Sequence, residues 1–387
     1  MVLAEDVSAE ERLFNANLFI VTGVVYLAFG GMLVYQSASS LGGVGSTAWQ
    51  VDVRRFWLAV PLLAAAILVG QTLVNDPGRA PWIFPAANLA VVAVPSMVVA
   101  AFAAHRYARS NPLSWPVSWR EWSSGFGYGA IGATTAAGII NTLYVIFAGA
   151  LAIHLFGEGD AFNLEENLPT LPRGLGVAFD LSVLSVVAPI NEEFWKGLLV
   201  ALFFFRRGGL ARCFLWGVLA GAGFNLIETF TNSLVVVNPD ALRDQQISGQ
   251  WWVFAVARAG TSVLHGAAAG MSALGIAAVL RRAPRFLWGY PAGVLLHASW
   301  NFMAYVVSGD AFLTQAGPDS TLLDVAGIAG MIAIFLAGCA IIWTLSARLR
   351  DARPAPVYDL LGMLPAVAGP APSTKVVAPA TPSPAPE

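Results

Sequence analysis

Nine apolar runs, each long enough to cross a lipid bilayer as a helix, determine what this chain of 387 residues can fold into. A membrane-spanning helix needs about 20 such residues. Hydrophobic residues make up 57% of the chain and charged residues only 11%, a balance that soluble domains of this length do not have. We therefore predict an all-α, polytopic transmembrane helix bundle of about nine spans. The expected spans are residues 17–36, 56–75, 82–104, 127–156, 174–205, 213–237, 252–280, 286–307 and 324–345.

Arginine collects in alternate connections between these spans, which predicts their orientation because cytoplasmic loops carry the excess of positive charge. The N-terminus is then expected outside and the C-terminus in the cytoplasm. The arginine groups are Arg54 and Arg55; Arg106, Arg109 and Arg120; Arg206, Arg207 and Arg212; Arg281, Arg282 and Arg285; Arg348, Arg350 and Arg353. The opposite connections hold the acidic residues Glu158, Asp160, Glu165, Glu166, Asp240 and Asp244.

The chain divides into three parts. Residues 1–16 are expected to be a short extracytoplasmic segment, and residues 17–346 a membrane domain with its catalytic core at 174–307. Residues 347–387 are rich in proline and alanine, so they are expected to be a disordered cytoplasmic tail. The net charge of -2 offers no basic face for a nucleic acid, and the two cysteines, Cys213 and Cys339, provide no disulfide framework.

Ionisable or strongly polar side chains lie deep inside four consecutive spans. A charge in hydrocarbon costs roughly 2.5 kcal/mol or more, so such residues normally face the bundle interior and mark a functional site. Counted from the cytoplasmic end of each span, Glu192, Glu228, His265 and His297 lie roughly 17 to 23 Å deep, which places one polar group of each span in a slab near the middle of the membrane. The residues are Glu192, Glu193 and Lys196; Glu228; Arg258 and His265; His297 and Asn301.

Spacing within each helix agrees with one inward polar face. Glu192 and Lys196, Phe224 and Glu228, and His297 and Asn301 are each four residues apart, a separation that puts both side chains on the same face. Adjacent carboxylates point to different faces, so we expect one of Glu192 and Glu193 to act directly and the other to support it.

These groups are suited to hydrolysis inside the membrane, which requires a base for water and donors for the oxyanion. Glu192 or Glu193 is a candidate base, and Lys196 a candidate partner that keeps Glu192 ionised. His265, His297 and Asn301 are candidates for orienting water or stabilising the oxyanion. Alternatively, Glu228, His265 and His297 form a carboxylate and two-histidine set suited to catalytic zinc. The zinc-protease motif HExxH is absent.

The same residues resemble a known family. Glu192-Glu193-Phe194-Trp195-Lys196 is similar to the EExxK motif of PrsW-type intramembrane proteases, and Phe224 to Glu228 is similar to their FxxxE. The segment from Arg258 to His265 and the HxxxN of His297 and Asn301 resemble the later histidine motifs. The resemblance covers roughly residues 174–307.

The resemblance implies an intramembrane endopeptidase that cleaves a single-span membrane protein, for which an anti-sigma factor is the associated substrate. It also implies a multi-pass protein of a bacterial plasma membrane and kinship with CAAX prenyl proteases and bacteriocin-immunity proteins. Those relatives have histidine where this chain has Glu228, so either zinc or a metal-free glutamate mechanism remains open. The alternative function is a proton-coupled transporter, because buried Glu, Lys and His also form proton relays.

Overall fold

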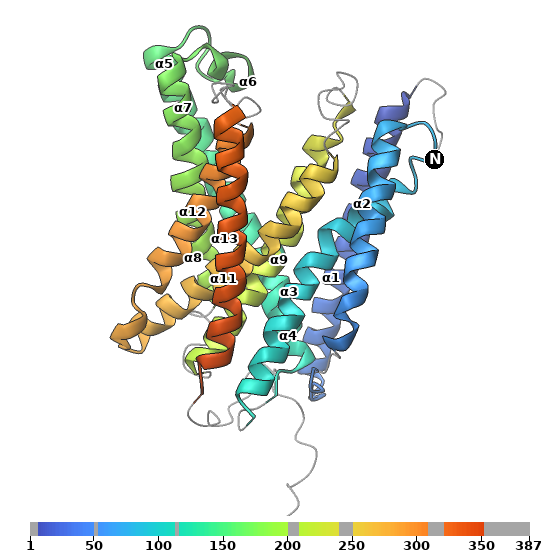
Figure 1. Ribbon diagram of the computed structural model, residues 1–387, viewed down its shortest axis with the longest axis vertical. Coiled ribbons are helices and arrows are strands. Elements are labelled where there is room, and N and C mark those ends of the chain that lie inside the picture. Colours follow the sequence, from blue (N-terminus) through green and yellow to red (C-terminus); the bar gives the residue numbers. More distant parts are fainter. Residues whose placement is uncertain are drawn as a thin grey trace, which may run out of the picture.

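The structure, a computed structural model, describes residues 7–49, 53–112, 116–199, 209–239, 251–308 and 321–351 (Figure 1). Within these ranges the chain is helical, with no β-strand and one isolated bridge between Ala48 and Ser118. The predicted all-α fold is confirmed. The helices are α1 (Ala9–Leu41), η1 (Val53–Leu58), α2 (Ala59–Asn75), α3 (Phe84–Ser110), α4 (Trp119–Gly127), η2 (Tyr128–Ala133), α5 (Thr134–Phe156), α6 (Leu164–Asn167), η3 (Leu168–Thr170), α7 (Arg173–Leu181), η4 (Ser182–Val187), α8 (Ala188–Leu199), α9 (Leu210–Val236), α11 (Trp251–Leu280), η6 (Pro284–Phe286), α12 (Gly289–Ser308) and α13 (Thr321–Arg348).

Eight helical stretches in the described ranges are long and apolar enough to cross a membrane, so the protein is a multi-pass membrane protein. The first seven expected spans and the ninth, residues 324–345, each overlap one of these stretches. The remaining expected span, residues 286–307, corresponds to α12, which is not among the eight. Helix α12 has only 20 residues, and two of them are His297 and Asn301. These polar residues lower its mean hydropathy below that of the other spans. The total of nine spans stays a prediction.

Two helices begin earlier than their apolar runs because polar caps start them. Ser8 accepts a hydrogen bond from the backbone N–H of Glu11, and Glu11 returns one, so α1 begins at Ala9 rather than near residue 17. Ser118 and Glu121 form the same capping box at the start of α4. Glu121 also binds Arg212 of α9 at 2.6 Å, which ties the start of α4 to the start of α9.

Helices α9 and α11 form the centre of the bundle. In the most apolar part of α9, 89% of the residues are buried, whereas the figure for α1 is 11%. Helix α9 packs against α11, α3, η2, α4 and α8. Glycine makes the closest approaches possible, because a Cβ on Gly221 would lie 2.1 Å from the His265 carbonyl oxygen. A Cβ on Gly217 would lie 2.3 Å from that of Ala269.

The ends of several helices carry charged residues on which the predicted orientation was based. Figure 1 shows the connection through α5, α6 and α7 at the top, and the start of α4 and the end of α13 at the bottom. The acidic residues Glu158 to Glu166 lie at the top, and Arg120 and Arg348 at the bottom. Which end faces the cytoplasm stays a prediction. Several residues used for it lie outside the described ranges: Arg206, Arg207, Asp240, Asp244, Arg353 and the tail from residue 352.

The last described residue of the chain is held against the start of α9. The Asp351 carboxylate accepts hydrogen bonds from the Tyr107 hydroxyl at 2.8 Å and from the Ala211 backbone N–H at 3.1 Å. The Asp351 backbone N–H donates to the Asn111 side chain at 2.9 Å. The end of α13 is therefore joined to α3 and α9.

Replacing Gly221 with alanine is expected to destabilise the protein, because the new methyl group collides with the His265 carbonyl and must separate α9 from α11. Overpacking of this kind typically costs about 1–3 kcal/mol. Thermal or denaturant unfolding in detergent micelles measures the loss. Gly138→Ala in α5 is the matched control, since a Cβ there meets nothing within 4 Å. Equal stability of the two variants would contradict the close approach.

Candidate functional site

The helix that carries the paired glutamates begins with a distorted turn. Segment η4 has π-helical hydrogen bonding, in which the Ala188 N–H donates to the Val183 carbonyl five residues before it. The Leu184 carbonyl therefore loses its ordinary partner, and the next residue in register, Pro189, has no N–H to offer. Asn301 of α12 donates its side-chain N–H to this carbonyl at 2.8 Å. The distortion is thus stabilised from a neighbouring helix, and it fixes the start of α8.

Two carboxylates and one ammonium form the centre of the site. Lys196 Nζ lies 2.9 Å from Glu193 Oε1 and 3.3 Å from Glu192 Oε2, all on α8. Lys196 and Glu193 are fully buried, whereas Glu192 keeps 8% of its surface exposed. The two carboxylates compensate the ammonium in an apolar bundle, where an unpaired charge would be costly.

His297 faces both glutamates. Its Nδ1 lies 3.0 Å from Glu193 Oε1, and because a carboxylate accepts hydrogen bonds, Nδ1 donates its proton to it. The neutral ring then has its lone pair on Nε2, which lies 3.8 Å from Glu192 Oε2. That distance is too long for a direct hydrogen bond. Glu193 has its other oxygen bound by the Ser272 hydroxyl at 3.3 Å, so its carboxylate is fully used in positioning.

His265 connects the centre to a second ion pair. Its Nδ1 lies 2.9 Å from Lys196 Nζ and accepts from it, while its Nε2 donates to Glu228 Oε2 at 2.7 Å. Arg258 contacts the same Glu228 oxygen at 3.2 Å. The Glu228 side chain is 29% exposed, which makes it the most accessible carboxylate of the group. The ring of Phe224 lies beneath the Lys196 ammonium at 3.9 Å and against His265.

The four polar helices therefore converge as their depths in the sequence suggested. Glu192, Glu193, Lys196, Glu228, His265 and His297 form one connected cluster, with Phe224 and Arg258 in direct contact with it. Asn301 donates a side-chain N–H to the Leu184 carbonyl, and its expected role in orienting water or stabilising the oxyanion stays a prediction.

Sequence reasoning assigned no role to two asparagines that support the site, Asn141 of α5 and Asn191 of α8. Asn141 donates to Glu192 Oε1 at 3.2 Å, and Asn191 donates to Asn141 Oδ1 at 2.8 Å and to the Ala137 carbonyl at 2.9 Å. Asn141 thus fixes the carboxylate that has the most freedom. Its signal in the sequence was an uncharged amide in an otherwise apolar span, with no ionisable neighbour to draw attention to it.

One group of residues in the described ranges has the geometry of a metal site. Glu192, His265 and His297 each bring a ligand atom to within 4.8 Å of the others. A carboxylate oxygen with two imidazole nitrogens is a donor set of catalytic zinc sites. The bond from His297 Nδ1 to Glu193 is the outer contact that orients metal-binding histidines. The predicted zinc set contained the same two histidines but Glu228 as the carboxylate. In the structure Glu228 is bound to Arg258 and His265, and Glu192 is the carboxylate beside both histidines.

Formal charges in the cluster leave one negative charge in excess. Glu192, Glu193 and Glu228 contribute three carboxylates, whereas Lys196 and Arg258 contribute two cations, and both histidines can be neutral. A proton or a cation beside Glu192 and His297 would compensate the difference. Such an arrangement is compatible with proton transfer and with metal binding.

The structure thus describes a multi-pass membrane protein with a buried cluster of ionisable groups. Residues 117–337, more than half of the chain, match the family described as PrsW family intramembrane metalloprotease, and the chain belongs to that family. The family assignment supports an intramembrane protease. No curated protein and no solved structure matches the chain.

Replacing Asn301 with leucine is expected to lower the free energy of unfolding by about 1–3 kcal/mol, because the Leu184 carbonyl then has no donor. Chemical unfolding in micelles measures this. Pro189→Ala supplies a backbone N–H near the same carbonyl, so in its presence the cost of Asn301→Leu is expected to fall. Additive effects of the two changes would contradict the assignment of Asn301 to this carbonyl.

Proposed function

We propose that the protein hydrolyses a peptide bond in or beside the membrane-spanning segment of a single-span membrane protein, in a bacterial plasma membrane. An anti-sigma factor is the substrate suggested by the family resemblance. One observation carries the proposal: a gap of 3.8 Å between Glu192 Oε2 and the lone pair of His297 Nε2 at the centre of a buried cluster. A water molecule beside both atoms would meet two acceptors for its protons.

Glu192 is the base in this proposal. It is the member of the adjacent pair with exposed surface, and one of its oxygens faces the gap. Glu193 is fully buried, and its oxygens are bound by Lys196, His297 and Ser272. Glu193 is therefore a positioning residue, which keeps the lone pair of His297 turned toward Glu192.

The reaction can be written in terms of these groups. Glu192 accepts a proton as the oxygen of water bonds to the peptide carbonyl carbon. It then passes this proton to the departing amine as the C–N bond breaks. The Lys196 ammonium, 3.3 Å from Glu192, and the Asn141 amide, 3.2 Å from it, hold the Glu192 carboxylate in position for this role.

The residues also fit a zinc ion. Glu192, His265 and His297 would hold it, with His265 offering Nδ1 in exchange for its bond to Lys196. When bound, zinc would lower the pKa of a water molecule and polarise the peptide carbonyl. Glu193 would keep His297 in the tautomer that leaves Nε2 free.

Glu192→Gln is expected to reduce peptide cleavage by about 10²–10⁴-fold, because the amide cannot accept the proton. Glu193→Gln is expected to reduce it as well, through the loss of the His297 orientation, while retaining more activity than Glu192→Gln. The assay is cleavage of a panel of single-span membrane proteins in liposomes by each purified variant. Glu165→Gln, in the exposed connection after α5, is the matched control and should cleave at the wild-type rate.

The proposal is wrong if well-folded wild-type protein cleaves no member of the panel and instead conducts protons in a manner that depends on Glu192. That outcome would favour the transporter.

Metal dependence is tested by elemental analysis and by adding a chelator. We expect about one zinc ion per chain, loss of cleavage on chelation and recovery with zinc. His297→Ala is expected to abolish metal binding, and Glu193→Gln to weaken it by about 10–100-fold. His154→Ala, at the exposed end of α5, is the control and should retain the metal. Full activity in a metal-free preparation would leave Glu192 as a metal-independent base.

A further inference from the structure

Helix α9 is buried along its first half and exposed along one face of its second half. Every residue from Ala211 to Leu226 is buried, whereas Ile227 and Glu228 are partly accessible, Thr231 is exposed and Val235 is 65% exposed. The most central helix of the bundle therefore opens to its surroundings at one place, which begins beside Glu228.

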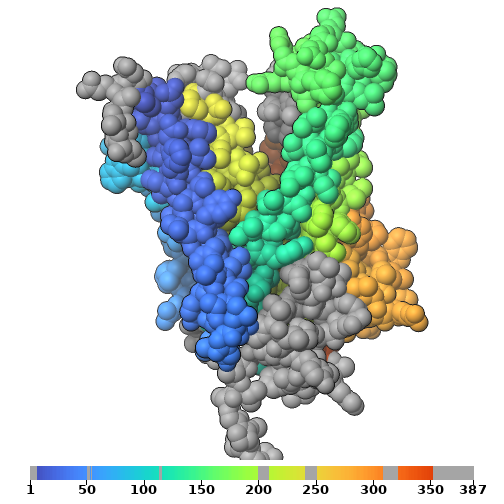
Figure 2. Space-filling model, turned by 180° about the vertical axis from the view of Figure 1, so that it is seen from behind, coloured from blue at the N-terminus to red at the C-terminus, as the bar shows by residue number. Residues whose placement is uncertain are grey.

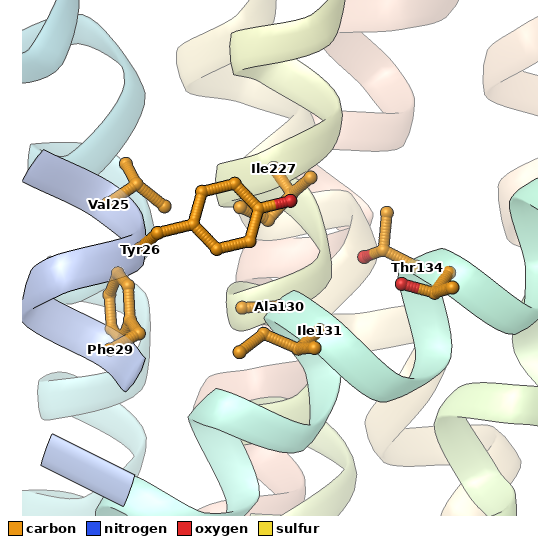
Figure 3. Close-up of a pocket in the computed structure, with 8 residues that line it drawn as sticks. Val25, Tyr26, Phe29, Ala130, Ile131, Thr134 and Ile227 are labelled. Carbon is orange, nitrogen blue, oxygen red and sulfur yellow. The ribbon is translucent and has the colours of Figure 1, made fainter. Parts of the chain in front are cut away.

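This exposed face forms the floor of a groove between α1 and α5. Figure 2 shows α1 (blue) and α5 (green) diverging toward the top, with α9 (yellow) visible between them. Deeper in the groove is a cavity of about 80 Å³ (Figure 3). Tyr26 and Phe29 of α1 line one wall, Thr134 and Thr135 of α5 line the other, and Ile227 lies at the floor.

Two helices lead from the groove toward the candidate site. On the floor, Ile227 is followed by Glu228, whose carboxylate contacts His265 at 2.7 Å. On the wall, Thr134 and Asn141 are seven residues apart and so share a face of α5, and Asn141 contacts Glu192 at 3.2 Å. A molecule lying in the groove would thus extend from the bundle surface toward Glu192.

The groove combines apolar walls with polar groups at the level of the bilayer. The groove is lined by the hydroxyl groups of Tyr26, Thr134 and Thr135. Glu228, which forms an ion pair with Arg258, is the residue after Ile227 at the floor. The Thr134 hydroxyl is bound to the Gly129 carbonyl, but a lipid chain offers no acceptor to the hydroxyls of Tyr26 and Thr135, which is costly in hydrocarbon. A polypeptide that is being cleaved offers both apolar side chains and backbone amides.

We propose that this groove receives the membrane-spanning segment of the substrate, and that the cavity beside Phe29 selects one of its side chains. The proposal rests on the proteolytic function given above. A cavity of about 80 Å³ is larger than the roughly 30 Å³ of a water molecule and smaller than the cavity of about 150 Å³ that holds benzene, so it suits a single aliphatic side chain of moderate size. The wall formed by α1 lies outside residues 117–337, so the selecting surface joins the region that matches the family to one that does not.

Filling the cavity tests this. Thr135→Trp is expected to reduce cleavage of membrane-embedded reporters by about tenfold or more, because the indole occupies the space of the substrate side chain. The reporters are single-span proteins in liposomes. Each has a 20-residue membrane segment of leucine and alanine, in which a patch of four consecutive residues is varied from one reporter to the next. A short soluble peptide with the same cleaved bond should be hydrolysed at the wild-type rate. Ile140→Trp, exposed on the other side of α5 from Thr134 and Thr135, is the matched control and should cleave both substrates normally.

Equal cleavage of the membrane-embedded reporters by Thr135→Trp and the wild type would overturn the proposal. Enlarging the cavity gives a second measurement: Phe29→Ala should shift the preferred residue in the patch toward a larger side chain. If Phe29→Ala and the wild type prefer the same residue in the patch, α1 does not select the substrate side chain.

Crosslinking separates a failure of the groove from a failure of the proteolytic function. A photoreactive phenylalanine in place of Tyr26, in the Glu192→Gln background, is expected to attach to the reporter segment without any cleavage. The same group in place of Tyr35, exposed elsewhere on α1, is the control and should not. Adducts formed with lipid alone would show that the groove holds lipid.

Discussion

The charge of Lys196 is the constraint on which the rest of the site depends. A single ammonium at the centre of the bundle touches Glu192, Glu193 and His265, and thereby joins α8 to α11. Removing one partner of a buried ion pair typically costs about 3–5 kcal/mol, because the other charge is left uncompensated. Lysine suits this position because its compact head contacts three groups lying in different directions, whereas the planar fork of arginine favours bidentate pairing. Lys375 is the one other lysine in the chain, and the remaining basic residues of the Lys and Arg total are arginines.

Backbone hydrogen bonding explains features that the motifs alone do not. The distorted turn η4 and the proline that follows it leave the Leu184 carbonyl without a backbone donor, and Asn301 supplies one from α12. A second distorted turn, η2, precedes α5, where the Thr134 hydroxyl donates to the Gly129 carbonyl at 2.8 Å. Each distortion lies directly before a helix that brings a polar side chain to Glu192 or carries Glu192 itself. The two turns set how α5 and α8 are rotated, and therefore where Asn141 and the glutamates point.

Much of this organisation was predictable from the sequence because a membrane restricts the possibilities. Apolar runs identified the helices, and counting residues along them placed Glu192, Glu228, His265 and His297 at one depth. The rotation of one helix against another could not be counted in this way, so Glu228 was assigned to the metal set that the geometry gives to Glu192. Asn141 was missed because a neutral amide in a span is common and carries no charge signal. The start of α1, in contrast, was readable from Ser8 and Glu11, a capping pair outside the apolar run.

The contact between Gly221 and the His265 carbonyl has a mechanical consequence. Helices α9 and α11 touch through their backbones there, so neither can shift along the other without a collision. The floor of the groove and an imidazole of the site therefore belong to one rigid body. The position of a bound segment relative to the reacting groups is then set by helix packing, with no flexible loop between them to adjust it. If the groove holds the substrate as proposed, cleavage should consequently occur at a fixed distance from the residue whose side chain occupies the cavity.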